Sequence, residues 1–136
     1  MNDIHGYLES WRKDPGGVRP VVTRLFEQLQ KYEPDFEFVV REGVSASLRA
    51  RVRKPGTARP LFCLVDIVED ADGRWLSVCF YADTVSDSNE SGNLVPEGLL
   101  GEDGYCFDVD GADAEYEGYL FDRIAQAHAA VLAGNS

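Results

Sequence analysis

The sequence predicts an α+β domain in which two N-terminal helices and one long C-terminal helix pack on a mainly antiparallel sheet of about five strands. Apolar residues recur with helical spacing near both ends of the chain and with a spacing of two between them. The strand patterns follow one another directly, which favours antiparallel pairing. At 136 residues the chain has the size of one domain, so we expect residues 1–136 to form a single unit.

Two amphipathic helices are predicted in the N-terminal part. The first covers residues 3–13 and begins at a cap formed by Asn2 or Asp3. Its apolar positions are Ile4, Leu8 and Trp11. The second helix has Pro20 in its first turn and ends near Tyr32, before a Glu-Pro pair. Its apolar stripe consists of Val22, Leu25, Phe26 and Leu29.

Four strand segments are predicted next, over residues 36–40, 44–53, 61–68 and 74–82. In the second segment, one face is apolar and consists of Val44, Ala46, Leu48, Ala50 and Val52. The third segment, LFCLVDIV, is almost continuously apolar and indicates a central strand covered on both faces. A three-residue loop over 71–73 would place Cys79 opposite Val65, on the same face as Cys63.

Residues 84–104 contain no convincing strand or long helix, so we expect a long loop there. Its apolar residues predict that it docks on the domain: Leu94, Val95, Leu99 and Leu100. A short fifth strand is expected over 105–109, followed by a helix from about Ala114 to Leu132 that stops at Gly134. The buried face of that helix is predicted to contain Tyr116, Leu120, Ile124, Ala127 and Val131.

The net charge of −11 is unevenly distributed along the chain. Residues 1–40 have a net charge of −2, residues 41–59 of +5 and residues 60–136 of −14. A chain this acidic repels nucleic acid and anionic membranes, so we expect neither as a partner. No apolar run approaches the roughly 20 residues of a membrane span, and the first residues lack the apolar core of a signal peptide. We therefore expect a cytoplasmic protein, and no motif predicts a cofactor.

The three cysteines, Cys63, Cys79 and Cys106, form no CxxC pair. An odd number without such a pair matches neither a disulfide framework nor a zinc site. Each lies in an apolar or aromatic run, where free cysteine is usually buried. We expect three reduced, buried thiols.

The acidic stretch GEDGYCFDVDGADAEYE, residues 101–117, partly matches a calcium-binding loop. Placing Gly111 at the sixth loop position puts a cysteine at the first position and an aspartate at the eighth, which suits neither position. We favour a strand end, a turn and a helix start whose first amides donate to Asp113. The alternative is a looser divalent-cation surface formed by Asp108, Asp110, Asp113 and Glu117.

The arginine strand is the other candidate site. Arg49, Arg51 and Arg53 alternate and project from one sheet face, where guanidinium groups suit carboxylate or phosphate. The alternative is a set of cross-strand ion pairs, and one register would place Arg49 beside Asp66. No nucleophile, phosphate-loop or zinc-protease motif is present, so Asp66 is the single weak catalytic candidate.

The order of the predicted elements resembles that of a known group of small domains. Four segments carry this resemblance: REGVSASLRARV, PLFCLVDIV, RWLSVCFYAD and EGYLFDRIAQAHAAVLA. Over residues 20–133 the chain resembles small bacterial α+β domains of the YjbR and YdhG kind. The resemblance implies a frataxin-like topology and hardly a function. Frataxins bind iron on an acidic ridge, but the first helix, NDIHGYLESWRKD, lacks a dense run of acids, so no residue role is transferred.

Together these observations predict a non-enzymatic binding module for a partner protein or a small anionic ligand. We expect its site between the arginine face of strand 44–53 and loop 84–104. One alternative is a divalent-cation-binding acidic surface. Another is a small hydrolase or isomerase that uses Asp66 and loop carboxylates.

Overall fold

The structure of the protein, a computed structural model, describes residues 4–134 and has the predicted α+β class. The described helices are α1 (Ile4–Ser10), α2 (Arg19–Gln30) and α3 (Ala114–Leu132), with a short 3₁₀ turn η1 (Ala82–Thr84). The described strands are β1 (Asp35–Arg41), β2 (Ser45–Arg51), β3 (Leu61–Asp70), β4 (Gly73–Tyr81), β5 (Asn93–Leu99) and β6 (Glu102–Val109).

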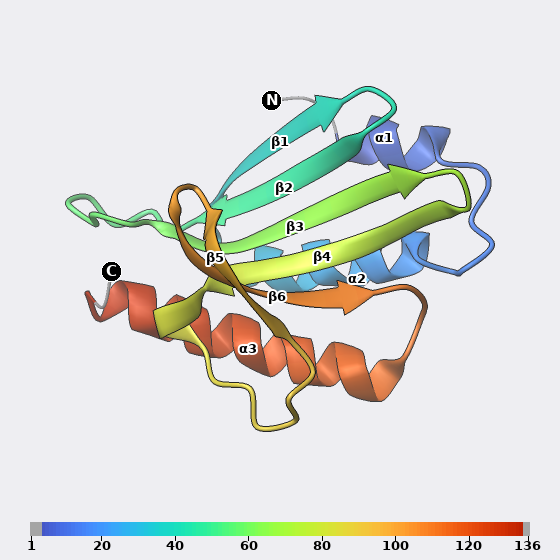
Figure 1. Ribbon diagram of the computed structural model, residues 1–136. Coiled ribbons are helices and arrows are strands. Elements are labelled where there is room, and N and C mark those ends of the chain that lie inside the picture. The colour runs from blue at the N-terminus through green and yellow to red at the C-terminus, as the bar shows by residue number, and fades with distance from the viewer. Residues whose placement is uncertain (1–3, 135–136) are drawn as a thin grey trace.

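The described strands form one antiparallel sheet in the order β1-β2-β3-β4-β6-β5. Six strands therefore replace the five that the sequence predicted. The three helices lie on one side of this sheet, as Figure 1 shows, and the opposite side carries no helix. We call this opposite side the helix-free face.

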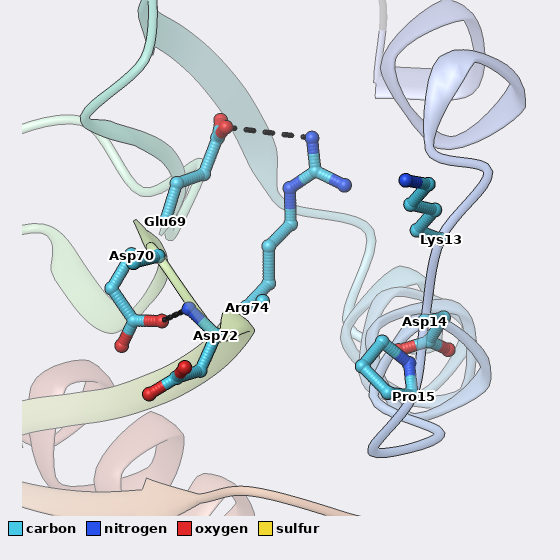
Figure 2. Close-up of a pocket in the computed structure, with 9 residues that line it drawn as sticks. Lys13, Asp14, Pro15, Glu69, Asp70, Asp72 and Arg74 are labelled. Carbon is cyan, nitrogen blue, oxygen red and sulfur yellow. Dashed lines mark hydrogen bonds and ion pairs between the residues drawn. The ribbon is translucent and has the colours of Figure 1, made fainter.

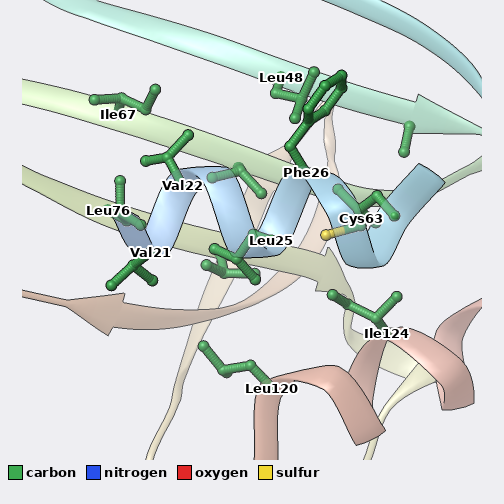
Figure 3. Packing of buried hydrophobic residues seen from close by; sticks show 14 of the residues in the cluster. Val21, Val22, Leu25, Phe26, Leu48, Cys63, Ile67, Leu76, Leu120 and Ile124 are labelled. Carbon is green, nitrogen blue, oxygen red and sulfur yellow. The ribbon is translucent and has the colours of Figure 1, made fainter. Parts of the chain in front are cut away.

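The core lies between the sheet and the helices. Directly opposed residues cross the sheet in one row on this side: Phe38, Leu48, Val65, Val78 and Phe107. All five are at most 2% exposed. Figure 3 shows α2 lying across the strands over this region, while Leu120 and Ile124 approach from α3. Burying each large apolar side chain stabilises the fold by roughly 1.5–3 kcal/mol, so this side of the sheet provides most of the hydrophobic stabilisation.

The N-terminal helices match the prediction in order but not in length. Helix α1 ends at Ser10 rather than at residue 13, and the predicted cap residues Asn2 and Asp3 lie outside the described residues. Beyond α1, the indole of Trp11 donates to the carbonyl oxygen of Lys13 at 3.0 Å, which holds the chain in a non-helical path.

Helix α2 begins with Pro20 in its first turn, as predicted. Its N-terminal amides are satisfied by Asp14, a residue of the preceding turn. The Asp14 carboxylate accepts from the amide of Val18 at 2.8 Å and from that of Arg19 at 2.9 Å. Asp14, which directly follows the range predicted for the first helix, therefore caps the second helix.

The turn between β3 and β4 is shorter than predicted. Asp70 pairs with Gly73, so two residues rather than three form the loop. The carboxylate of Asp70 accepts from the amide of Asp72 at 2.9 Å, which stabilises this tight turn. The register consequently shifts by one, and Cys79 lies opposite Leu64 instead of Val65. The expected common face of Cys63 and Cys79 is therefore wrong, because a shift of one residue reverses the face.

The expectation of a long loop over 84–104 is also wrong, because β5 and the start of β6 lie within this range. Leu100 and Gly101 connect the two strands with φ angles of 51° and 86°, as a two-residue hairpin turn requires. Strand β5 carries Pro96 at the sheet edge and a register shift between Val95 and Leu99. Proline and bulges are tolerated at edges, but they conceal the alternation by which a strand is recognised.

In the loop between η1 and β5, one carboxylate, that of Asp87, accepts several hydrogen bonds. Asp87 accepts hydrogen bonds from the hydroxyls of Tyr119 at 2.6 Å and Tyr105 at 2.8 Å. It also accepts from the amides of Gly92 at 2.8 Å and Ser91 at 3.1 Å. This acid thus joins the loop to both β6 and α3.

Helix α3 has the predicted bounds and the predicted cap, since Asp113 accepts from the amide of Tyr116 at 3.2 Å. The buried face contains Leu120, Ile124, Ala127 and Val131, as expected. It also contains Glu117 rather than Tyr116, because that acid pairs with Arg24 of α2. No helix within residues 4–134 is long and apolar enough to cross a membrane.

Candidate functional site

The helix-free face contains a cavity of about 530 Å³ that receives side chains from every strand of the sheet. Two rows of directly opposed residues cross this face. One row consists of Val39, Ser47, Asp66, Ser77 and Asp108. The neighbouring row consists of Glu37, Arg49, Leu64, Cys79, Cys106 and Asn93. All of these except Glu37 line the cavity, which thus combines polar and apolar walls.

Asp66 lies near the middle of the cavity floor and is half-buried. Desolvation by burial raises the pKa of its carboxyl group, and the positive charges of Arg41 and Arg49 oppose that rise. Within residues 4–134, no hydrogen bond or ion pair joins the Asp66 side chain to another group. Its carboxyl group therefore interacts with Arg41 and Arg49 through their charge at a distance, and not through a hydrogen bond or an ion pair.

Arg49 is the one predicted arginine that lines the cavity. Its Nη1 lies 3.4 Å from Oε1 of Glu37, and its Nε is buried without a hydrogen-bond partner among the described residues. Arg41, which sequence reasoning did not select, lines the cavity as well. The signal was present, because Arg41 alternates with Val39 and therefore projects from the same face.

The other two predicted arginines lie outside the cavity and form ion pairs with acids of β1. Arg51 places Nη1 at 3.2 Å from Oε1 of Glu37, and Arg53 places Nε at 2.8 Å from Oδ1 of Asp35. Neither lines the cavity. Cross-strand ion pairing, the alternative derived from the sequence, describes both of them.

The apolar wall contains a disulfide bond between Cys79 and Cys106, with Leu64 and Leu99 beside it. The prediction of three reduced thiols is wrong for these two cysteines, and it holds for Cys63, which is free and buried in the core. Burial raises the pKa of the Cys63 thiol. The bonded pair is 27 residues apart, and its contact depends on β6 inserting between β4 and β5.

The four acidic candidates for a cation surface are placed apart. Asp108 lines the cavity, whereas Asp113 caps α3. Glu117 lies on the helix side, where its carboxylate is 2.6 Å from Nε of Arg24. Asp110 lies beside the turn before α2, with its carbonyl oxygen next to Gly16. Among the described residues, no three His, Cys, Asp or Glu side chains are grouped to hold a metal ion.

A second hollow, of about 600 Å³, lies between the β3–β4 turn and residues 13–15 (Figure 2). Four of its charged residues, Asp14, Glu69, Asp70 and Arg74, have partners within the fold, although the Nε of Arg74 is buried without one among the described residues. Glu69 contacts Arg74 at 3.5 Å and accepts from the Tyr7 hydroxyl at 3.1 Å. Asp14 caps α2, and Asp70 holds the turn. The cavity of the helix-free face is therefore the stronger candidate for a functional site.

Comparison with known proteins yields no match: no protein-family model fits the chain, and neither a curated protein nor a solved structure is significantly similar to it. The resemblance to the YjbR and YdhG domains therefore stays a prediction. The function has to be argued from the cavity itself.

Proposed function

We propose that the protein is a non-enzymatic binding module that holds a small anionic ligand in the cavity of the helix-free face. One observation carries the proposal: Arg41, Arg49, Ser45 and Ser47 all line this cavity, and the buried Nε of Arg49 has no hydrogen-bond partner among the described residues. Buried polar groups in proteins normally have partners, so the unsatisfied Nε of Arg49 indicates a place for an acceptor.

The chemistry of the donors favours a carboxylate or a similar oxyanion. A guanidinium group presents several N–H donors in a planar fork that matches the two oxygens of such a group. Serine hydroxyls can supply additional donors next to it. A carboxylate placed beside Arg49 would give its buried Nε the acceptor that the described residues do not provide.

The charge and size of the cavity limit the ligand further. Asp66 and Asp108 also line it and oppose a second negative charge on the ligand. The volume of about 530 Å³ is typical of sites for metabolite-sized molecules. Leu64 and Leu99 offer a contact for an aliphatic portion. These features favour a small monoanion with an apolar part over a partner protein.

The first test uses butyrate as the probe, followed by calorimetric titration and by the thermal unfolding midpoint at pH 7. We expect saturable binding to the native protein, with an unfolding midpoint that rises with butyrate concentration. Arg49→Ser should weaken the affinity by roughly ten-fold, because one charged hydrogen-bonding partner is lost. Arg53→Ser is the matched control, since Arg53 follows the same strand by two residues and lies outside the cavity. Equal weakening by both changes, or no saturable binding, would contradict the proposal.

Binding should also depend on pH through Asp66. Because burial raises its pKa, this carboxyl group takes up a proton at a higher pH than an exposed aspartate does. Neutral Asp66 leaves the charges of Arg41 and Arg49 uncompensated, so anion affinity should rise as the pH falls.

The pH series uses 1-butanesulfonate, whose charge is constant, between pH 7 and pH 5. We expect the affinity of the wild-type protein to increase as the pH falls, because the raised pKa of Asp66 lets its carboxyl group take up a proton before an exposed aspartate does. Asp66→Asn should bind with the higher affinity throughout and show no such increase. A pH dependence that survives in Asp66→Asn would assign the effect to another group.

A further inference from the structure

We propose that the Cys79–Cys106 disulfide is a thiol–disulfide exchange site for small thiols that enter the cavity of the helix-free face. The two half-cystines are directly opposed on the neighbouring strands β4 and β6. Their sulfur atoms belong to the cavity wall, and each residue is 8% exposed. The bond is therefore reached from the cavity and not from the hydrophobic core.

The sheet is built so that this bond can open without unfolding. Strands β4 and β6 are paired from Leu76 opposite Val109 to Tyr81 opposite Gly104, on both sides of the disulfide. Strand β6 also pairs with β5 on its other edge. These ladders keep the two sulfur atoms facing each other after reduction, so the same pair can form the bond again.

The third cysteine cannot take part in this chemistry. Cys63 is fully buried on the helix side of the sheet, whereas the disulfide lies on the helix-free face. Burial also raises the pKa of the Cys63 thiol, which disfavours the reactive thiolate. Cys63 thus serves as an internal reference, because its reaction with a thiol reagent would show that the native core has opened.

The surroundings of the bond distinguish its two sulfur atoms. The hydroxyl of Ser77 lies 3.3 Å from Sγ of Cys79. Because a disulfide sulfur carries no hydrogen, the hydroxyl is the donor of this contact. A hydrogen-bond donor stabilises a thiolate, and a more stable thiolate is the better leaving group. Cys79 is therefore the leaving sulfur, and Cys106 is the sulfur that an incoming thiolate attacks.

The exchange proceeds in two balanced steps. The thiolate of a small thiol attacks Sγ of Cys106, and the Cys79–Cys106 bond breaks with its electron pair on Sγ of Cys79. That thiolate accepts the Ser77 hydrogen bond and then a proton from solvent. A second small thiolate attacks the mixed disulfide, releasing the Cys106 thiolate and a small-molecule disulfide. Two small thiols are oxidised as the protein disulfide is reduced, and a small-molecule disulfide reverses both steps.

The first experiment treats the native protein with 2-mercaptoethanol, quenches with an excess of iodoacetamide under native conditions and locates the alkylated thiols by mass spectrometry. A neutral thiol keeps the test independent of the proposed anion binding. We expect Cys79 and Cys106 to become labelled in the absence of denaturant, while Cys63 stays unlabelled. Labelling of all three cysteines at one common rate, or labelling only after denaturation, would overturn the proposal, since opening would then require global unfolding.

A second experiment tests which sulfur is attacked. With 2-hydroxyethyl disulfide as the probe, Cys79→Ser should accumulate a mixed disulfide at Cys106 of the folded protein. In the wild-type protein, Ser77→Ala should slow reduction by 2-mercaptoethanol by roughly three- to ten-fold, because the leaving thiolate loses its donor. Ser47→Ala is the control, since Ser47 lines the same cavity and, within residues 4–134, its hydroxyl makes no hydrogen bond to either sulfur. Equal effects of the two serine changes, or a Cys106 that forms no mixed disulfide, would overturn the assignment.

Discussion

Replacement of Glu117 by alanine is expected to lower the free energy of unfolding by about 2–3 kcal/mol. The Glu117 side chain is 5% exposed and accepts from Arg24 through Nε at 2.6 Å and Nη2 at 3.0 Å. It also accepts from the amide of Asp113 at 3.0 Å. The change removes the link between α2 and α3 and leaves these donors without their acceptor. Because the Arg24 side chain is 44% exposed, water compensates in part, and the loss stays at the lower end for such pairs.

The measurement is urea unfolding followed by circular dichroism at pH 7. Glu115→Ala is the matched control, because Glu115 lies in the same first turn of α3 but is exposed. Glu115→Ala should lower the free energy of unfolding only by the interaction of this acid with the helix dipole, about 0.3–1 kcal/mol. A Glu117→Ala protein that is no less stable than Glu115→Ala would show that the buried ion pair does not hold the two helices together.

The second large effect is expected at Asp87, where Asp87→Asn should lower the free energy of unfolding by about 2 kcal/mol at pH 7. Desolvation by burial raises the pKa of this carboxyl group, but hydrogen bonds from Tyr119, Gly92, Tyr105 and Ser91 lower it to about 2 overall. In Asp87→Asn, an NH₂ group replaces one carboxylate oxygen. This group is a hydrogen-bond donor and faces hydroxyls and amides that also donate. The loop between η1 and β5 therefore loses the hydrogen bonds by which Asp87 joins it to Tyr105 of β6 and Tyr119 of α3, while Ser86 still contacts Arg123 and Gln126 of α3.

This contribution has a defined pH dependence. A carboxyl group whose pKa is lower in the folded state stabilises the fold above its unfolded pKa, near 3.8. The stabilisation is lost as the pH falls from about 4 towards 2. The difference in unfolding free energy between wild type and Asp87→Asn should therefore shrink over that range.

Urea unfolding at pH 7, 4 and 3 measures this difference. Glu90→Gln is the control, since it removes one exposed charge from the same loop and should change stability little at any of these pH values. A difference between wild type and Asp87→Asn that is constant with pH would mean that the hydrogen-bonded charge is not its source.

The elements that the sequence predicted well are those with local signals. Helix α3 has a capping aspartate at Asp113, a regular apolar stripe and a stopping glycine at Gly134, so its bounds follow from neighbouring residues alone. The β1–β2 hairpin likewise follows from strict alternation on both sides of Gly43. Strand β5 lacked such a signal, because Pro96 and the bulge after Val95 interrupt its alternation.

The candidate site was predictable only in part. The expected region, the arginine face beside residues 84–104, does contain the cavity wall, and alternation is enough to place Arg49 on that face. Alternation cannot separate Arg49 from Arg51 and Arg53, because a spacing of two assigns all three to one face. Which of them reaches the cavity depends on the register with β1 and β3 and on the register shift after Ala50, which no single strand determines.

The amino-acid sequence by itself determined the α+β class, the amphipathic helices and the separation of a basic segment, residues 41–59, from an acidic C-terminal half. Each of these follows from residues close together in the chain. Only the tertiary structure decided that β6 lies between β4 and β5, which of the arginines reach the cavity and which cysteines meet. The physical reason is that strand order and register are set by the burial of the whole sheet face against the helices. A one-residue shift, such as the one at the β3–β4 turn, reverses the face of every side chain that follows in the strand.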